Sequence, residues 1–232
     1  MRKILLTMSI LTIGLTAGAQ TSFLGNKLET DKFMIDANGR LMKPNRNFDE
    51  EGSPYNTKEF MEGTVTLGNG NTYKGLSVRI NFLSNEVEFI DNTGNEMVIA
   101  LPVKEVQVKT PDGTKVYRAG FSPVEGREIT AFYEVLDSGS ALLLKYAEVK
   151  FSERQPYPNA RFVRTYRDRT LYYMSTDGKS VKRMPKDAAE IPALLGGQQK
   201  EMMGFIQKES IKLKREDDMI KLFRHYNALA KG

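Results

Sequence analysis

Residues 60–151 constrain the fold more than any other part of the chain, because short apolar runs alternate there with turn-forming residues. Apolar side chains recur at every second position, as in Leu76, Val78 and Ile80, which is the spacing of a strand with one buried face. The runs end at turn-forming residues, such as the glycines and asparagines of residues 68–71. No helical period interrupts the series, so the pattern predicts an antiparallel β-meander.

The meander divides into four predicted hairpins. Each turn contains glycine together with asparagine, aspartate or serine, which accept the backbone angles of tight turns. The predicted turns lie at residues 68–71, 92–95, 111–114 and 137–140. They separate strands predicted over residues 64–67 and 73–83, 86–90 and 97–101, 106–108 and 116–118, and 129–136 and 142–151.

Residues 1–19 have the order of a secretory signal. Two basic residues precede an uncharged apolar run over residues 4–15, and the small residues 17–19 follow. The apolar run is shorter than the roughly 20 residues that a helix needs to span a bilayer. We therefore predict that the signal is cleaved after Ala19 and that the protein is exported, either to the periplasm or out of the cell.

The composition excludes several classes of function. The chain has no cysteine, which rules out disulfides, thiolate catalysis, cysteine metal sites and anchoring through a lipidated cysteine. The chain that follows the predicted signal is long enough for one large or two small domains stabilised by burial alone. The formal net charge of +5 includes two charges in the signal, and the remainder is too small to indicate a partner.

Outside the meander, the apolar pattern divides the chain further. Residues 20–59 are polar and predict a short strand or hairpin followed by an irregular arm. Residues 152–185 begin with a loop that contains two prolines, and they predict a second, smaller set of strands. From residue 186 the period changes to three or four residues, which predicts helices over residues 186–232. The predicted fold class is therefore α+β and mainly β, an antiparallel meander, sandwich or barrel-like, with a helical C-terminal subdomain.

The helical region carries its own start and stop signals. Asp187 and Glu190 form a capping pair before a first short helix, and the glycines of residues 196–197 end it. Residues 198–208 and 215–229 each present one apolar stripe, which is typical of core contacts. The acidic residues 216–218 lie in the first turn of the last helix, where carboxylates complement the helix dipole, and we favour this role over metal binding.

One segment shows a charge asymmetry. Residues 150–186 contain ten basic residues against three acidic ones, interleaved with aromatic side chains. Arginine pairs with anions while aromatic rings stack on sugars or bases, so an acidic glycan, a lipid headgroup or an envelope protein would fit this segment, and we expect nucleic acid least. Period-two geometry places Arg161 and Arg167 on one face and Arg164 on the other. The alternative is a solvated strand face with the rings turned into the core. The candidate patch comprises Arg161, Arg164, Tyr166, Arg167, Arg169 and Tyr172.

Catalytic signatures are scarce. His225 is the only histidine and lies among basic residues near a helix end, and the sequence shows no nucleophile-elbow, zinc, phosphate-loop or calcium motif. Glu86 and Glu88 would share a strand face about 7 Å apart, which is compatible with a glycosidase pair. An alternating glutamate face is also the ordinary solvent side of a strand. We therefore predict no catalytic residue, no cofactor and no metal, with a carboxylate-dependent hydrolase acting on glycans as the alternative.

Several short motifs carry a resemblance that spans nearly all of the chain after the signal. They are Gly52-Ser53-Pro54-Tyr55, Phe60, Gly63-Thr64-Val65, Tyr73, Arg79-Ile80-Asn81, Glu88-Phe89, Glu216-Asp217-Asp218 and His225-Tyr226-Asn227. With these motifs the chain is similar to a set of uncharacterised exported proteins of Gram-negative bacteria. The resemblance implies an exported, β-rich protein with a helical ending, and it implies no activity. From the sequence we expect a non-enzymatic binding or structural module of the cell envelope.

Overall fold

The computed structural model describes residues 49–158 and 160–230. The predicted signal and residues 20–48 of the predicted polar segment lie outside these residues. The described strands and helices follow one another as β1 (Asp49–Glu51), β2 (Met61–Leu67), β3 (Thr72–Asn81), β4 (Glu86–Ile90), β5 (Glu96–Val98), β6 (Val103–Thr110), β7 (Gly113–Arg118), β8 (Tyr133–Asp137), β9 (Leu142–Arg154), β10 (Val163–Ser175), β11 (Lys182–Arg183), the 3-10 turn η2 (Ala188–Glu190), α1 (Ile191–Leu195), α2 (Gln199–Lys208) and α3 (Glu216–Leu229).

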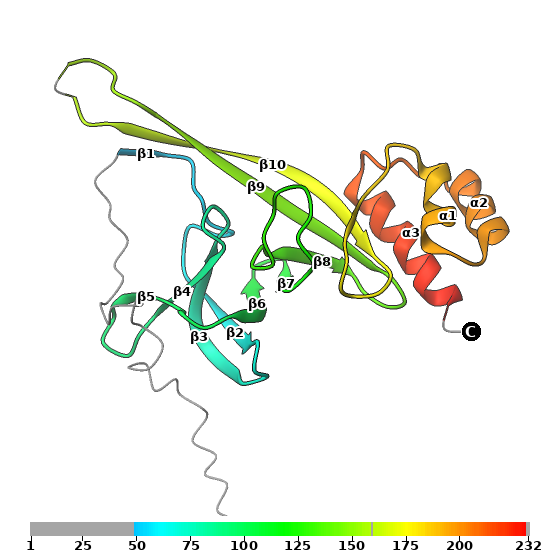
Figure 1. Cartoon of the computed structure of the whole chain (residues 1–232), viewed down its shortest axis with the longest axis horizontal. Coiled ribbons are helices and arrows are strands. Elements are labelled where there is room, and N and C mark those ends of the chain that lie inside the picture. The colour runs from blue at the N-terminus through cyan, green and yellow to red at the C-terminus, as the bar shows by residue number, and fades with distance from the viewer. Residues whose placement is uncertain (1–48, 159, 231–232) are drawn as a thin grey trace, which may run out of the picture.

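The predicted fold class is confirmed: the protein is mainly β, and its helices follow the sheet in the sequence. All strands belong to one open sheet with the order β1-β10-β9-β8-β7-β6-β2-β3-β4-β5, and β11 pairs with β10. Only β1 and β10 are parallel, while the other neighbouring strands are antiparallel. Figure 1 shows the helices at one end of the molecule and the loop between β9 and β10 at the other.

The order of the strands is not that of a simple meander, because β6 pairs with β2 and not with β5. After the short β5 the chain turns back toward β2, whose other edge is free. The Gly68 amide at the end of β2 donates a hydrogen bond to the Pro102 carbonyl just before β6 (2.7 Å). At Gly63 the two neighbours of β2 approach closely, since an added Cβ would lie 2.6 Å from both the Gln107 carbonyl and Val78. The sheet curls there around the largest apolar core.

Three boundaries differ from the prediction. The expected division after residue 151 falls inside β9, and β10 pairs with β9 over its full length. The strands expected over residues 161–167 and 170–175 are therefore one strand, since the ladder with β9 continues through the polar residues Asp168 and Arg169. The strand expected from residue 129 begins at Tyr133 instead, because Ala131 closes a turn with the Glu128 carbonyl (3.0 Å).

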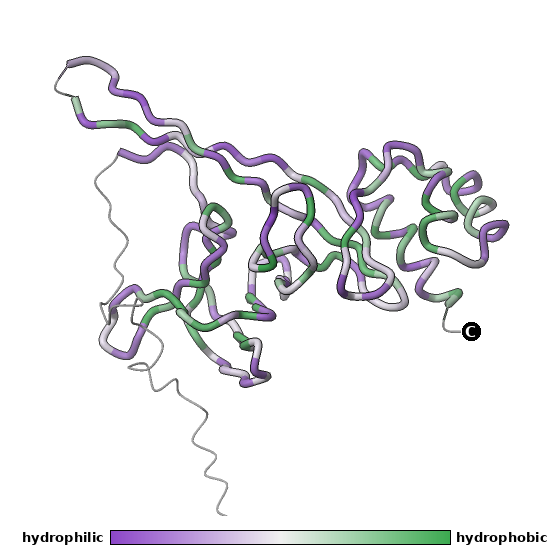
Figure 2. The backbone as a smooth tube through the Cα atoms, in the orientation of Figure 1, coloured by the Kyte–Doolittle hydropathy of each residue, from purple (hydrophilic) through white to green (hydrophobic). Residues whose placement is uncertain are grey.

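Three apolar clusters stabilise the fold. The first lies inside the curled β2–β7 region and includes Val65, Ile80 and Phe89. The second lies between the helices and one face of β8–β10, and the third lies on the opposite face of the same strands. Alternation along β9 explains this division, because Leu143 faces the helices while Leu144 faces the other way. Figure 2 shows these apolar regions and a predominantly hydrophilic outer part of the β9–β10 hairpin.

The predicted helices are confirmed to within one residue. The Asp187 carboxylate accepts a hydrogen bond from the Ala189 amide and caps η2, and Gly196 and Gly197 adopt positive φ angles of 75° and 67° where α1 ends. Tyr226 of α3 donates a hydrogen bond to the Leu195 carbonyl (3.0 Å) and so connects α3 to α1. The helical subdomain is thus fixed to the sheet and to itself.

Candidate functional site

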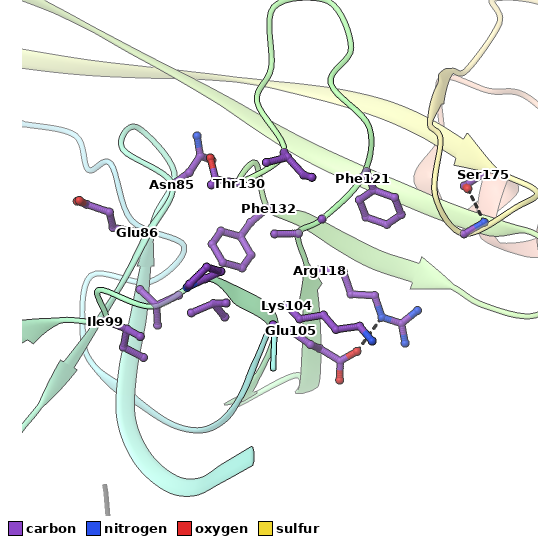
Figure 3. A pocket seen from close by; sticks show the side chains of 18 of the residues that line it. Asn85, Glu86, Ile99, Lys104, Glu105, Arg118, Phe121, Thr130, Phe132 and Ser175 are labelled. Atoms are coloured by element: carbon purple, nitrogen blue, oxygen red, sulfur yellow. Dashed lines mark hydrogen bonds and ion pairs between the residues drawn. The ribbon is translucent and has the colours of Figure 1, made fainter. Parts of the chain in front are cut away.

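A cleft of about 1520 Å³ opens along the curled part of the sheet. It is lined by the β3–β4 turn and β4, by the chain from β5 into β6, by the segment between β7 and β8, and by the turn after β10. Figure 3 shows Phe121 and Phe132 among its lining side chains, together with the charged side chains of Lys104, Glu105 and Arg118. The cleft therefore combines an apolar wall with a few charged groups.

The apolar part of the cleft contains side chains that remain exposed. Phe121 and Phe132 are buried in its wall. Leu101 and Ile129 also line it, although 42% and 54% of their surfaces are exposed. Exposed large apolar side chains that gather in a concavity are typical of binding sites, whereas scattered ones need no explanation.

The segment that carries Ile129 is held in place by a buried arginine. The Arg127 guanidinium lies 4.6 Å from the centre of the Tyr146 ring and pairs with Glu125 (3.0 Å) and Glu148 (3.5 Å). Backbone hydrogen bonds between Val124 and Arg127 close a tight turn around it. This side of the cleft is therefore a fixed wall, because its cation is attached to β9.

The charged groups of the cleft are themselves paired. Arg118 donates a hydrogen bond from Nε to the Glu105 carboxylate (2.7 Å). Burial raises the pKa of Glu105, but hydrogen bonds from Gln107 and Arg118 lower it more, so the pKa lies below its ordinary value. Glu105 is therefore a stable anion at neutral pH and a poor proton donor. This pair orients polar groups at the cleft and does not supply acid catalysis.

The structure divides the candidate anion patch between two faces of the β9–β10 hairpin. Arg164, Tyr166 and Tyr172 share one face, and Arg167 and Arg169 share the other, as the register with β9 requires. Tyr172 lies at the helical end, where its hydroxyl donates to Glu216 (2.8 Å), far along the strand from Arg164. The six residues do not form one surface.

Most of the arginines in the patch already have acidic partners. Arg161 pairs with Asp49 of β1 (2.9 Å), Arg164 with Glu153 (2.5 Å) and Arg169 with Glu148 (2.8 Å). Tyr166 is buried, and its hydroxyl donates a hydrogen bond to Glu50 (3.1 Å). Arg167 is exposed and forms no ion pair with any described residue. Binding of a free polyanion to this patch stays a prediction, and it would have to compete with these carboxylates.

The interpretation of Glu86 and Glu88 as a solvent face is wrong for Glu88. Only 3% of Glu88 is exposed, and its carboxylate accepts hydrogen bonds from Arg79 Nε (2.8 Å), from an Arg79 terminal nitrogen (2.6 Å) and from the Tyr55 hydroxyl (3.2 Å). The period-two pattern failed here because the segment before β2 covers this face of β4.

The covering segment forms an aromatic sandwich around Arg79. The guanidinium lies 3.9 Å from the centre of the Tyr55 ring and 4.1 Å from that of Phe60. Glu88 and Glu96 neutralise it from the side. Tyr55, Phe60, Arg79 and Glu88 therefore meet in one cluster, in which Arg79 and Glu88 are buried and the two rings are half-buried. Its polar groups are occupied by one another, so it connects the segment before β2 to β3 and β4.

The remaining sequence candidates have structural partners. His225 stacks on the Phe205 ring at 3.9 Å. Glu216 lies in the first turn of α3 as predicted and pairs with Lys145 (2.9 Å). Within residues 49–158 and 160–230, no group of three histidine or acidic residues is arranged to hold a metal ion. The cleft was not predicted from the sequence, in which Leu101 and Ile129 appear only as apolar residues at the ends of predicted strands; in the structure both lie in the connections between strands.

No protein-family model, no curated protein and no solved structure matches the chain. None of the described helices is long and apolar enough to cross a membrane. The function is therefore inferred from the geometry of the cleft and its lining residues.

Proposed function

We propose that the protein is an exported, non-enzymatic binding module whose ligand occupies the cleft between the curled sheet and the β7–β8 segment. The observation that carries this proposal is the exposure of Leu101 and Ile129 inside the concavity. Covering such side chains is favourable by roughly 25 cal/mol per Å² of apolar surface removed from water. A ligand that covers them would gain the same contribution.

The dimensions and lining of the cleft favour an elongated amphipathic ligand. Its volume of about 1520 Å³ exceeds the roughly 300 to 1,000 Å³ of a site for one compact small molecule. The apolar wall suits a hydrocarbon or aromatic portion, while Lys104 and the Arg118–Glu105 pair offer groups for a polar end. An acyl chain with a polar headgroup combines these properties.

The hydrolase alternative has less support. A glycosidase needs two carboxyl groups that face the same substrate. Glu88 is buried and already accepts hydrogen bonds from Arg79 and Tyr55. Of the predicted pair only Glu86 lines the cleft, and the other carboxylates that line it, Glu105 and Asp177, already accept hydrogen bonds from Arg118 and Ser180. We therefore favour binding without chemistry, and glycan hydrolysis that the wild type performs and Glu86→Gln loses would contradict that choice.

Binding to the cleft can be tested with the fluorescent anionic dye 1-anilinonaphthalene-8-sulfonate and with a lysophospholipid as competitor. We expect a saturable site from which the lysophospholipid displaces the dye. Leu101→Asp and Ile129→Asp should each weaken dye binding, because a carboxylate would enter the apolar wall. Leu194→Asp is the matched control, since Leu194 is also exposed (37%) but lies on α1 outside the cleft. Equal loss in all three variants, or in none, would contradict the proposal.

Export is a separate part of the proposal and has its own test. The resemblance to exported Gram-negative proteins and the order of residues 1–19 support it. Mass spectrometry of the native protein should find Gln20 at the N-terminus. Protein recovered from the envelope fraction with Met1 intact would refute both the cleavage site and the compartment.

A further inference from the structure

The outer edge of β10 is only partly paired. β1 pairs with residues 163–165, and β11 pairs with Tyr173 and Met174. Between them, residues 166–172 have β9 on one side and no strand on the other within the described part of the chain. At about 3.3 Å per residue, this window is roughly 20 Å long, which is enough for a strand of about six residues.

The backbone of this window presents free hydrogen-bonding groups. The Phe162 carbonyl accepts a hydrogen bond from Asp49 of β1, and the Tyr172 carbonyl accepts one from Met184 (2.9 Å). Both residues have even numbers, and the β9–β10 register has no shift between them. Because alternate residues of a strand bond to opposite neighbours, the N–H and C=O groups of Asp168 and Thr170 project from the same open edge. Both residues are exposed.

The side chains beside this edge indicate the charge of a strand that would fit it. β1 consists of three acidic residues, and it occupies the same edge one step away. Its Glu51 carboxylate lies 3.2 Å from Arg154 and accepts a hydrogen bond from Thr165 (2.8 Å). Arg167 follows Thr165 on the same face, exposed and without an ion-pair partner among the described residues. An acidic side chain next in line would meet Arg167.

The chain's own β1 does not continue into the window. Gly52 turns away with a positive φ angle of 82°. An added Cβ at this position would lie 2.8 Å from the Tyr166 carbonyl oxygen. Only glycine therefore fits at this position so close to β10. β1 therefore shows that an acidic strand can pair with this edge of β10. Because β1 ends before Gly52, the positions beside residues 167–172 remain open to a second acidic strand.

We propose that the edge of β10 between β1 and β11 binds an extended acidic segment of a partner protein by adding it to the sheet as a strand. The Asp168 and Thr170 backbone groups would supply the hydrogen bonds, and Arg167 would select acidic residues at alternate positions. The site is separate from the cleft and goes beyond the proposed function. A peptide fits better than a glycan because the free donors and acceptors repeat at the spacing of a strand.

The experiment uses the full chain from Gln20 and a capped nine-residue peptide in which glutamate and valine alternate, with a lysine–valine peptide as the opposite charge. Fluorescence anisotropy should show saturable binding of the glutamate peptide and weaker binding of the lysine peptide. Thr170→Pro removes one outward N–H and places a ring at the edge, without removing a bond to β9. We expect it to weaken binding about tenfold or more. Thr170→Val, which keeps the N–H, should bind like the wild type.

A charge exchange tests the same site without a change in the backbone. Arg167→Glu should weaken binding of the glutamate peptide and strengthen that of the lysine peptide, and thermal unfolding of each variant shows whether it folds. Equal binding by Thr170→Pro and Thr170→Val would overturn the proposal. The proposal would also be overturned if the glutamate peptide did not bind while heparin bound equally to the wild type and to Thr170→Pro. Arg167 would then belong to a surface for polyanions. Self-association abolished by Thr170→Pro in the absence of peptide would overturn it in favour of a second copy of this chain.

Discussion

The two halves of the β9–β10 hairpin use the same strands but are stabilised by different interactions. Near the helices, Leu143 and Met174 pack against α3 on one face, while Leu144 and Tyr173 pack against the third apolar cluster on the other. In the outer half, residues 148–154 and 163–169, both faces are mostly exposed. Ion pairs and hydrogen bonds predominate there, apart from Tyr166 and the neighbouring Phe151.

One β-ladder is therefore stabilised in two different ways along its length. Backbone pairing is continuous along all of β9 and β10, so the hydrogen bonds alone do not distinguish the halves. Burial of apolar side chains contributes several kcal/mol per residue, whereas exposed ion pairs contribute about 0 to 1 kcal/mol. The inner half therefore contributes most of the stability of the hairpin, and the outer half contributes little.

The largest effect is expected where α3 covers the inner half. Phe223 is completely buried among the residues of the second cluster. Phe223→Ala should lower the free energy of unfolding by about 3 to 5 kcal/mol, measured by chemical denaturation. Phe162→Ala is the control, because Phe162 lies just before the outer half of β10 and 47% of its surface is exposed, and it should cost far less. A midpoint unchanged by Phe223→Ala would mean that α3 does not dock.

A buried ion pair should rank next, in contrast to those of the outer hairpin. Glu88→Ala leaves the Arg79 guanidinium buried, with Glu96 (3.2 Å) as its remaining acidic partner among the described residues. We expect a loss of about 3 kcal/mol, at the lower end of the range for breaking a buried pair because Glu96 remains. Denaturation of Glu88→Ala beside Glu51→Ala, whose pair with Arg154 is exposed, measures the contrast. Equal losses would show that burial does not decide the strength of these pairs.

Tyrosine ionisation should weaken the inner half at high pH. Burial raises the pKa of Tyr133 to about 12, although Arg127 opposes the shift. Because the folded pKa exceeds the unfolded value near 10, the stabilisation is complete below pH 10 and is lost as pH rises toward 12. The loss at pH 12 should be roughly 1 to 3 kcal/mol. Denaturation at pH 9 and 11.5 should show a smaller decrease for Tyr133→Phe than for the wild type, and equal decreases would contradict this assignment.

Local pattern predicted most of the strands and all three α-helices. Alternation at Leu76, Val78 and Ile80 indicated β3, the Asp187 cap indicated the start of η2, which leads into α1, and the glycines after Leu195 indicated the end of α1. These signals are local, since neighbouring residues produce both the pattern and the element. Pairing between β2 and β6 is not local, and no residue within either strand specifies its partner.

The site was harder to predict for the same reason. Glu88 has the period of a solvent face, and only the approach of Tyr55 and Phe60 buries it. Leu101 and Ile129 are far apart in the sequence and become one concavity only after the sheet curls. The opposite faces of Arg164 and Arg167 were predictable because strand alternation is local. The pairing of Arg161 with Asp49 of β1 was not, because β1 lies far from Arg161 in the sequence.

The smallest effect is expected for the Arg164–Glu153 pair of the outer hairpin. Its nitrogen and oxygen are 2.5 Å apart, yet 22% and 33% of the two side chains are exposed, so water and salt screen the attraction. The Arg164 guanidinium also lies 4.7 Å from the centre of the Phe151 ring, and this contact survives the loss of Glu153. Glu153→Ala should therefore cost less than about 1 kcal/mol. A double-mutant cycle of Glu153→Ala with Arg164→Ala, at low and moderate salt, separates the ion pair from the ring contact. A coupling energy above about 2 kcal/mol that does not change with salt would mean that the outer hairpin is stabilised like the inner half, and the contrast between them would fail.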